Sequence, residues 1–308
     1  MTDSRTRARG NFRWSLEQGD LLPLLLMSPA VLLVGFVMLV PLIAGLGLSL
    51  FNFNFGGFSI QRDFVGFANY VRFFGDPTSL KSVLNSLAFS AGAIAGDLTL
   101  GTIAAVLILR LPRRAAAVVR PVMTIPLLIS PITVGLIWRY MYDPQGILYW
   151  FLGLFGLTLQ HFPGVTSPST ALLSTVIAHC WEVVPFVIIV LSAGLVSIPE
   201  ELYEAAYIDG SSAFRAFWTI TFPLLKDVYM VILLISGVDT IKVFDIIYAL
   251  TGGGPNNSTV SISIHAFNQA FANANLSYAM AISVIAMLLT FVVFGIPFIR
   301  RNRARVAS

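Results

Sequence analysis

Six long stretches almost free of charged residues constrain the fold more than any other feature of the sequence. A helix needs about 20 apolar residues to cross about 30 Å of hydrocarbon, and each stretch reaches that length. Only 11% of the 308 residues are charged, against about 25% in soluble domains, so a soluble globule is excluded. The sequence predicts an all-α polytopic membrane protein with a transmembrane domain over 21–299. Spans one to six are 21–51, 83–109, 118–140, 171–196, 224–250 and 276–299.

The basic residues predict the orientation of these spans, because cytoplasmic loops carry the excess of lysine and arginine. With the N-terminus inside, 14 of the 19 basic residues fall on the cytoplasmic side: Arg5, Arg7, Arg9, Arg13, Arg110, Arg113, Arg114, Arg120, Arg215, Lys226, Arg300, Arg301, Arg303 and Arg305. The opposite side holds Arg62, Arg72, Lys81, Arg139 and Lys242. We therefore predict a cytoplasmic N-terminal segment, 1–20, and a basic cytoplasmic tail, 300–308. Short arginine clusters between apolar runs are typical of topology signals rather than of a nucleic-acid-binding face.

A seventh apolar stretch, 147–159, is too short to cross the membrane, since 13 residues reach only about 20 Å. Four aromatic residues favour a helix at the outer interface; a hydrophobic loop packed on the bundle is the alternative. They are Tyr149, Trp150, Phe151 and Phe155.

The sequence lacks the motifs of several enzyme classes. A P-loop needs Gly before its lysine, whereas Lys81, Lys226 and Lys242 follow Leu80, Leu225 and Ile241. Cys180 is the one cysteine, and neither His-Glu-x-x-His nor Cys-x-x-Cys occurs. We therefore predict no catalytic residue, no metal site and no cofactor in this chain, with any ATP handled by a partner.

The loop between spans four and five, 198–223, reads as two short helices hinged at Gly210. Pro199 suits a first helical position and Gly210 a helix end. Aromatic residues then recur at helical spacing until Pro223, which is expected to end the segment before the membrane. A short surface helix with exposed aromatics requires a partner, so the loop is predicted to dock.

This loop resembles the EAA signature of permease subunits of binding-protein-dependent ABC importers. Glu204, Ala205, Ala206, Gly210, Ile220 and Pro223 fall in its register, with Phe222 in place of the usual leucine. Further stretches narrow the resemblance to carbohydrate importers of the maltose and glycerol-3-phosphate type and cover nearly the whole of 21–299. They include Phe64-Val-Gly-Phe-Ala-Asn-Tyr70, Ser130-Pro-Ile-Thr-Val-Gly-Leu-Ile-Trp138 and Leu250-Thr-Gly-Gly-Gly-Pro255.

The resemblance implies a multi-pass permease of a bacterial or archaeal cytoplasmic membrane. Its partners would be a similar but distinct second permease, two ATPase subunits that bind ATP and Mg, and an extracytoplasmic sugar-binding protein. The loop would be the coupling helix seated in an ATPase groove, with Glu204 making a charged contact. We call the following eight positions the coupling set: Glu204, Ala205, Ala206, Asp209, Gly210, Phe214, Ile220 and Pro223.

Ionisable residues inside the predicted spans are candidates for a sugar path, because buried charge is costly and usually faces a cavity or a partner. At 1.5 Å per residue, Glu182 lies about 16 Å from the outer end of span four, and Asp97 lies about 20 Å along span two. Asp239 and Asp245 lie about 22 Å and 31 Å from the inner end of span five. The predicted path comprises Asp97, Glu182, Asp239, Lys242 and Asp245, with Trp138, Trp181, Phe186 and Phe244 as stacking faces. Alternatively, Asp239 and Asp245 pair with Lys242 to fix span five.

A proton-coupled secondary transporter that uses Asp97 or Glu182 is the second candidate function. Inverted repeats would be its signature, and we find no convincing one. Gly92 and Gly96, four residues apart in span two, favour close helix packing rather than a functional role.

Overall fold

The computed structural model describes residues 21–52, 63–157 and 162–306. The predicted segment 1–20 with its four arginines and Arg62 lie outside these residues, so their placement stays a prediction. Five helices in the described part are long and apolar enough to cross a membrane, or up to six if one bent pair counts as a single span. The fold is therefore that of a multi-pass helical membrane protein, as predicted.

Three spans follow the sequence prediction closely. They are α2 (Leu21–Leu48), α4 (Pro77–Leu109) and α8 (Ala171–Val196). The sixth span is continuous from α14 (Leu276–Thr290) through the π-helical turn η5 (Phe291–Gly295) into α15 (Ile296–Val306). Span one ends before Phe51, which pairs instead with Phe64 between the two-residue strands β1 (Phe51–Asn52) and β2 (Asp63–Phe64).

Helix α4 begins six residues before the predicted start of span two because the local sequence forms a helix cap. The Asp76 carboxylate accepts the backbone N–H of Thr78 at 3.0 Å, and Pro77 occupies the first helical position. A proline there loses no intrahelical hydrogen bond.

Span three, predicted over 118–140, is broken into two helical parts. The chain forms α5 (Arg113–Thr124), the 3-10 turn η1 (Ile125–Leu128) and then α6 (Pro131–Met141), with a bend of 100° between the two parts. Proline disfavours helical geometry in the residue before it. Ser130, which precedes Pro131, accordingly has an extended ψ of 138°.

Span five differs from the prediction at both ends. The helix is continuous over 213–241, through α10 (Ala213–Ala216), the π-helical turn η3 (Phe217–Thr221) and α11 (Phe222–Ile241), so Pro223 does not end it. The hydrogen-bond register changes in the π turn, where Phe222 donates to the carbonyl of Phe217. The missing N–H of Pro223 falls just after that change and is tolerated there.

At its other end the span stops at Ile241, and 245–250 form a separate helix, α12 (Asp245–Leu250), that packs on α6. Two serine hydroxyls stabilise the break. Ser263 Oγ donates to the carbonyl of Lys242 at 2.9 Å, and Ser261 Oγ donates to that of Val243 at 2.8 Å. The predicted depth of Asp245 along span five is therefore wrong, because the helix axis on which it was measured ends four residues earlier.

Helices α4 and α8 pack along their lengths and form the centre of the bundle. Small residues on α4 permit this approach. A Cβ added at Gly96 would lie 2.5 Å from Cys180 Sγ, and one at Gly101 would lie 2.4 Å from Val187 Cγ1. The packing role predicted for Gly96 is confirmed, and Gly92 makes a looser approach to Val176.

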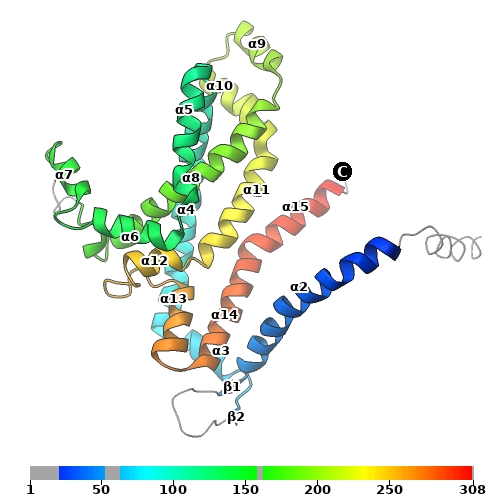
Figure 1. Ribbon diagram of the computed structural model, residues 1–308, viewed down its shortest axis with the longest axis vertical. Coiled ribbons are helices and arrows are strands. Elements are labelled where there is room, and N and C mark those ends of the chain that lie inside the picture. Colours follow the sequence, from blue (N-terminus) through cyan, green and yellow to red (C-terminus); the bar gives the residue numbers. More distant parts are fainter. Residues whose placement is uncertain (1–20, 53–62, 158–161, 307–308) are drawn as a thin grey trace, which may run out of the picture.

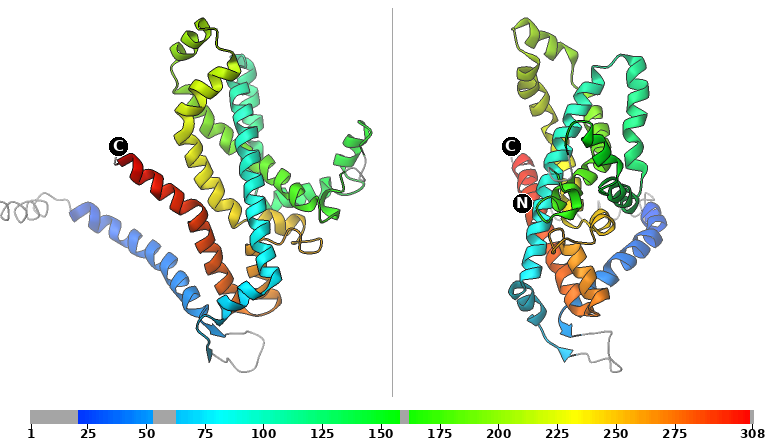
Figure 2. Two further views of the ribbon diagram at one scale, coloured as in Figure 1. Left: turned by 180° about the vertical axis from the view of Figure 1, so that it is seen from behind. Right: turned by 90° about the vertical axis from the view of Figure 1, so that its left-hand side faces the viewer.

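The ends of the bundle carry different short elements (Figures 1 and 2). Helix α9 (Glu200–Ile208), α10 and the start of α5 lie at one end; α3 (Ala68–Gly75), β1 and β2 lie at the other, with α13 (Ile262–Phe267) and η4 (Asn268–Ala272) nearby. Helix α2 touches α14 beside the strands, diverges from the bundle, and has no buried residue over Leu26–Leu48.

The short apolar stretch 147–159 is helical over α7 (Ile147–Gly153), and Tyr149 is its buried residue. Trp150 is 66% exposed, whereas the Tyr149 hydroxyl donates to the carbonyl of Phe162 at 3.1 Å. The stretch is therefore a short helix with one side held against the protein, and the alternative of a hydrophobic loop does not hold for 147–153.

Candidate functional site

Helix α9 ends in a hydrogen-bonded turn that requires glycine. Gly210 has φ +77°, the left-handed region. The N–H of Ser211 donates to the carbonyl of Ala206 at 2.9 Å, and the N–H of Gly210 donates to that of Tyr207 at 3.0 Å. This pair of bonds is the Schellman motif, which satisfies the carbonyls at a helix end and directs the chain away from the axis. The hinge predicted at Gly210 is therefore present.

Most of the surface of α9 is exposed. It contains no buried residue, and Ile208 is 86% exposed, Tyr207 51% and Leu202 44%. Six members of the coupling set are exposed: Glu204, Ala205, Asp209, Gly210, Phe214 and Pro223. Ala206 and Ile220 are half-buried. The structure thus gathers the first five members on one projecting turn and leaves an apolar and acidic surface free there.

Contacts at the base of the hairpin fix α9 to span five. The hydroxyls of Tyr203 and Thr221 lie 2.8 Å apart, which joins α9 to the turn η3. The Trp218 ring packs against Phe217 and Phe222, with centroids at 5.2 Å and 5.3 Å. Sequence reasoning missed Tyr203, because a tyrosine within a signature loop has no spacing signal of its own.

Asp97 lies in the interior of the bundle. It is fully buried between α4 and α8, and its Oδ2 lies 3.4 Å from Nε2 of His179, which is 7% exposed. Neither carboxylate oxygen has a hydrogen-bond partner within the described residues. His179 was not among the predicted site residues. Its contact with Asp97 cannot be predicted from the sequence without knowing which faces of spans two and four meet.

Four of the predicted path residues gather around α6, α8 and α12. Trp138 is 9% exposed and its ring centroid lies 6.2 Å from that of Trp181, which is 39% exposed. Glu182 is 8% exposed and lies within electrostatic range of Asp245, which is exposed at the start of α12. This arrangement places two carboxylates within electrostatic range of each other and brings two indole rings into contact.

Phe186 is apart from these residues, within a cluster around Val187 and Leu191. Phe244 stacks on Tyr248 with centroids 5.0 Å apart and an angle of 16° between the rings. Phe244 also lies beside Phe267, at 5.1 Å. It therefore belongs to an aromatic surface of α12 and α13 and does not meet the indole pair through any described ring contact.

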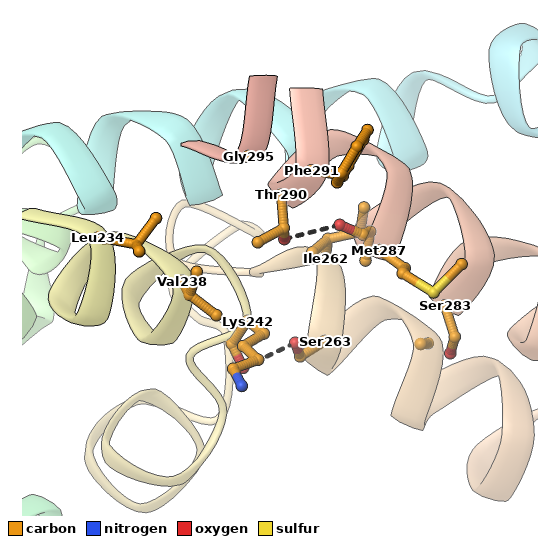
Figure 3. Close-up of a pocket in the computed structure, with 12 residues that line it drawn as sticks. Leu234, Val238, Lys242, Ile262, Ser263, Ser283, Met287, Thr290, Phe291 and Gly295 are labelled. Atoms are coloured by element: carbon orange, nitrogen blue, oxygen red, sulfur yellow. Dashed lines mark hydrogen bonds between the residues drawn. The ribbon is translucent and has the colours of Figure 1, made fainter. Parts of the chain in front are cut away.

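Asp239 and Lys242 form an ion pair at the end of α11, with 3.4 Å between Lys242 Nζ and Asp239 Oδ1. Both side chains are more than half exposed, so the pair contributes little to stability. Among the described ion pairs none joins Lys242 to Asp245. The alternative in which Lys242 pairs with both aspartates therefore holds for Asp239 only. Lys242 lies beside Ser263 at one end of a groove of about 570 Å³ between α11, α13 and α14 (Figure 3).

A second buried polar network lies near the strand end of the bundle. Ser79 Oγ is 2.7 Å from Asp76 Oδ2, 2.9 Å from His265 Nε2 and 2.8 Å from the Tyr278 hydroxyl. Burial alone would raise the pKa of Asp76, but hydrogen bonds from Ser79 and Thr78 and the nearby His265 lower it overall. Burial lowers the pKa of His265 despite the nearby Asp76 carboxylate. Residues 186 positions apart meet here, which no motif indicated.

No group of three or more potential metal ligands occurs within the described ranges. The geometry therefore presents an exposed hairpin, a bundle held by small residues, and polar groups buried inside the spans. These features suit a membrane component that moves with partners.

Residues 97–305 match the family described as binding-protein-dependent transport system inner membrane component. The trehalose/maltose transport system permease protein of Thermococcus litoralis is 36% identical over 246 residues, covering 80% of this chain and 82% of that protein. The sn-glycerol-3-phosphate transport system permease protein of Agrobacterium fabrum is 30% identical over 280 residues, covering 90% and 94%.

The fold also matches a solved structure. A bacterial ABC transporter involved in the import of the acidic polysaccharide alginate has a chain with a TM-score of 0.77 and 21% identity, covering 97% of this chain and 100% of that one. The family match includes the α9 loop and four of the spans. The chain therefore belongs to the family of inner membrane components of binding-protein-dependent transport systems.

Proposed function

We propose that this chain is the permease subunit of an ATP-driven ABC importer that translocates a sugar delivered by an extracytoplasmic binding protein. A second, homologous permease would complete the path, and two ATPase subunits would bind ATP and Mg. The sugar assignment is supported by the trehalose/maltose relative and by the indole and carboxylate pairs around Trp181 and Glu182. Sugar hydroxyls bind carboxylates, and sugar rings stack on aromatic faces.

The observation that carries the proposal is the projecting helix α9. It has no buried residue, exposes Ile208 at 86%, and is joined through Tyr203 to the start of span five. A rigid element with a free apolar surface suits a groove in an ATPase subunit, and movement there would be transmitted directly to 213–241. The side that carries α9, Arg113 and Arg215 would be cytoplasmic.

The first experiment separates coupling from assembly in the transporter reconstituted with its partners. Glu204→Ala is expected to abolish the stimulation of ATPase activity by sugar-loaded binding protein, together with uptake. Glu201→Ala, an equally exposed change on the same helix, is the matched control and should retain both. Normal coupled uptake in the Glu204→Ala transporter would contradict the coupling role.

A second experiment addresses the path. Glu182→Ala and Asp239→Ala are expected to lower sugar-stimulated uptake while assembly and basal ATPase activity persist. Failure to assemble would instead assign these carboxylates to structure. Sugar uptake by the purified chain alone, driven by a proton gradient and lost in Asp97→Asn, would support the secondary-transporter alternative.

A further inference from the structure

A groove of about 590 Å³ runs between α4 and the continuous helix 213–241. Residues of α4 from Leu98 to Arg110 form one wall, and Phe217, Trp218 and Phe222 contribute to the other. Figure 2 shows α4 and α11 side by side. None of the residues predicted for the sugar path lines this groove, and Phe214 is the single member of the coupling set that does.

The hydroxyl groups that line the groove are already hydrogen-bonded within the protein. The hydroxyls of Thr102 and Tyr229 lie 2.9 Å apart, and Thr99 Oγ1 donates to the carbonyl of Ala95 at 2.6 Å. An occupant therefore meets a surface of carbon atoms without free hydroxyl groups. That surface suits a hydrocarbon chain and does not suit a sugar, which requires hydrogen-bond partners.

The length of the groove matches one leaflet of a bilayer. The twelve steps from Leu98 to Arg110 correspond to about 18 Å along a helix. Half of a hydrocarbon core of about 30 Å is about 15 Å. An acyl chain laid along α4 would therefore extend from the headgroup level to the middle of the bilayer.

Positive charge lies at one end of this groove. Arg110 caps the end of α4, is exposed, and has no carboxylate oxygen within 4 Å among the residues that the structure describes. Trp218 is 51% exposed and Phe214 75% exposed at the same end. Tryptophan is enriched at the headgroup level, and basic pockets between spans bind anionic headgroups.

We propose that this groove binds one anionic phospholipid from the leaflet on the α9 side, with an acyl chain along α4 and the phosphate at Arg110. The site is independent of which sugar the transporter carries. The lipid would contact Phe217 and Trp218, in the turn to which Tyr203 joins α9. The composition of that leaflet would therefore influence the segment proposed to couple to the ATPase.

The test measures lipid retained by the full-length chain released from nanodiscs that contain equal phosphatidylglycerol and phosphatidylcholine, by native mass spectrometry. Arg110→Gln is expected to lower retained phosphatidylglycerol roughly fivefold, the effect of one basic residue near an anionic headgroup. Arg113→Gln, which removes an exposed arginine outside the groove, should leave it within about twofold of the wild-type level.

A second pair of variants tests the acyl chain. Ile103 lines the groove and is 57% exposed, whereas Leu100 on the same helix is 52% exposed and lies outside it. Ile103→Trp should fill the groove and lower the retention of both lipids, while Leu100→Trp should not. Equal losses in the two arginine variants, or full retention in Ile103→Trp, would overturn the proposal. A photo-cross-linker placed at position 103 in the assembled transporter gives a further test. Capture of a second transporter subunit in place of phospholipid would also overturn the proposal.

Discussion

Gly101 offers the sharpest test of how α4 and α8 are held together. In Gly101→Ala the new Cβ would lie 2.4 Å from Val187 Cγ1 and 2.7 Å from Val187 Cβ. Carbon atoms prefer about 3.5 to 4.0 Å, so the helices would have to separate by about 1 Å. Val187 is fully buried and its β-branched side chain has little freedom to rotate.

We expect this overpacking to cost about 3 kcal/mol, the upper end of the usual range. The higher helix propensity of alanine offsets about 1 kcal/mol of that cost. The remaining loss, about 2 kcal/mol, should lower the apparent unfolding midpoint by roughly 4 to 8 °C. Gly92→Ala is the matched control, because its Cβ would meet Val176 at 3.4 Å, an ordinary contact.

The assay uses the protein's own thiol. Cys180 is the one cysteine of the chain, is 5% exposed, and faces Gly96 across the same interface. A dye that fluoresces on reaction with thiols therefore reports when α4 and α8 separate during heating at a fixed rate. Equal midpoints for Gly101→Ala and wild type, or an equal decrease in Gly92→Ala, would refute the reasoning. Adding Val187→Ala to Gly101→Ala should recover part of the loss through local coupling.

Three further predictions follow from the polar and backbone features. Asp97→Ala should lower the unfolding midpoint in the same thiol assay because it leaves the buried His179 without its acidic neighbour, and Asp97→Ala/His179→Ala should cost less than the sum of the single changes. Gly210→Ala should cost about 1 to 2 kcal/mol at a φ of +77°, and limited proteolysis should then cleave faster at the end of α9. Because the pKa of His265 is lowered on folding, its neutral form stabilises the protein above about pH 6.5, and this contribution declines as the pH falls through that value. His265→Gln should remove the resulting slope of the unfolding midpoint below about pH 6.5, whereas the lowered pKa of Asp76 maintains the contribution of that carboxylate down to about pH 4.

Apolar length and helix-ending residues predicted much of the fold. Span four is correct to the residue, and Gly210 stands at the predicted hinge. Apolar length did not reveal the bend at Ser130-Pro131, because the apolar stretch 118–140 continues across it. Nor could it reveal the break after Ile241, since the serines that stabilise it, Ser261 and Ser263, follow some twenty residues later.

The candidate site residues likewise include some whose grouping the sequence could predict and others whose grouping it could not. The coupling set depends on contiguous sequence, so the structure keeps its first members together on α9. The path residues come from five separate helices, and their grouping depends on the rotation of each helix about its axis. That rotation places Asp97 against His179 and separates Phe244 from Trp138, which spacing along single spans cannot indicate.

The bend in span three also determines what can surround this subunit. The 16 residues of α5 and η1 correspond to about 24 Å of helix, less than the hydrocarbon thickness, so the non-helical peptide groups at Ile129 and Ser130 lie inside the apolar layer. Irregular backbone at that depth persists only against protein or a water-filled cavity. Part of this turn is covered by the chain itself, since Ile129 packs against a cluster that includes Ala178 of α8. We therefore expect the part that remains exposed, at Ser130, to face protein or a water-filled cavity and not lipid.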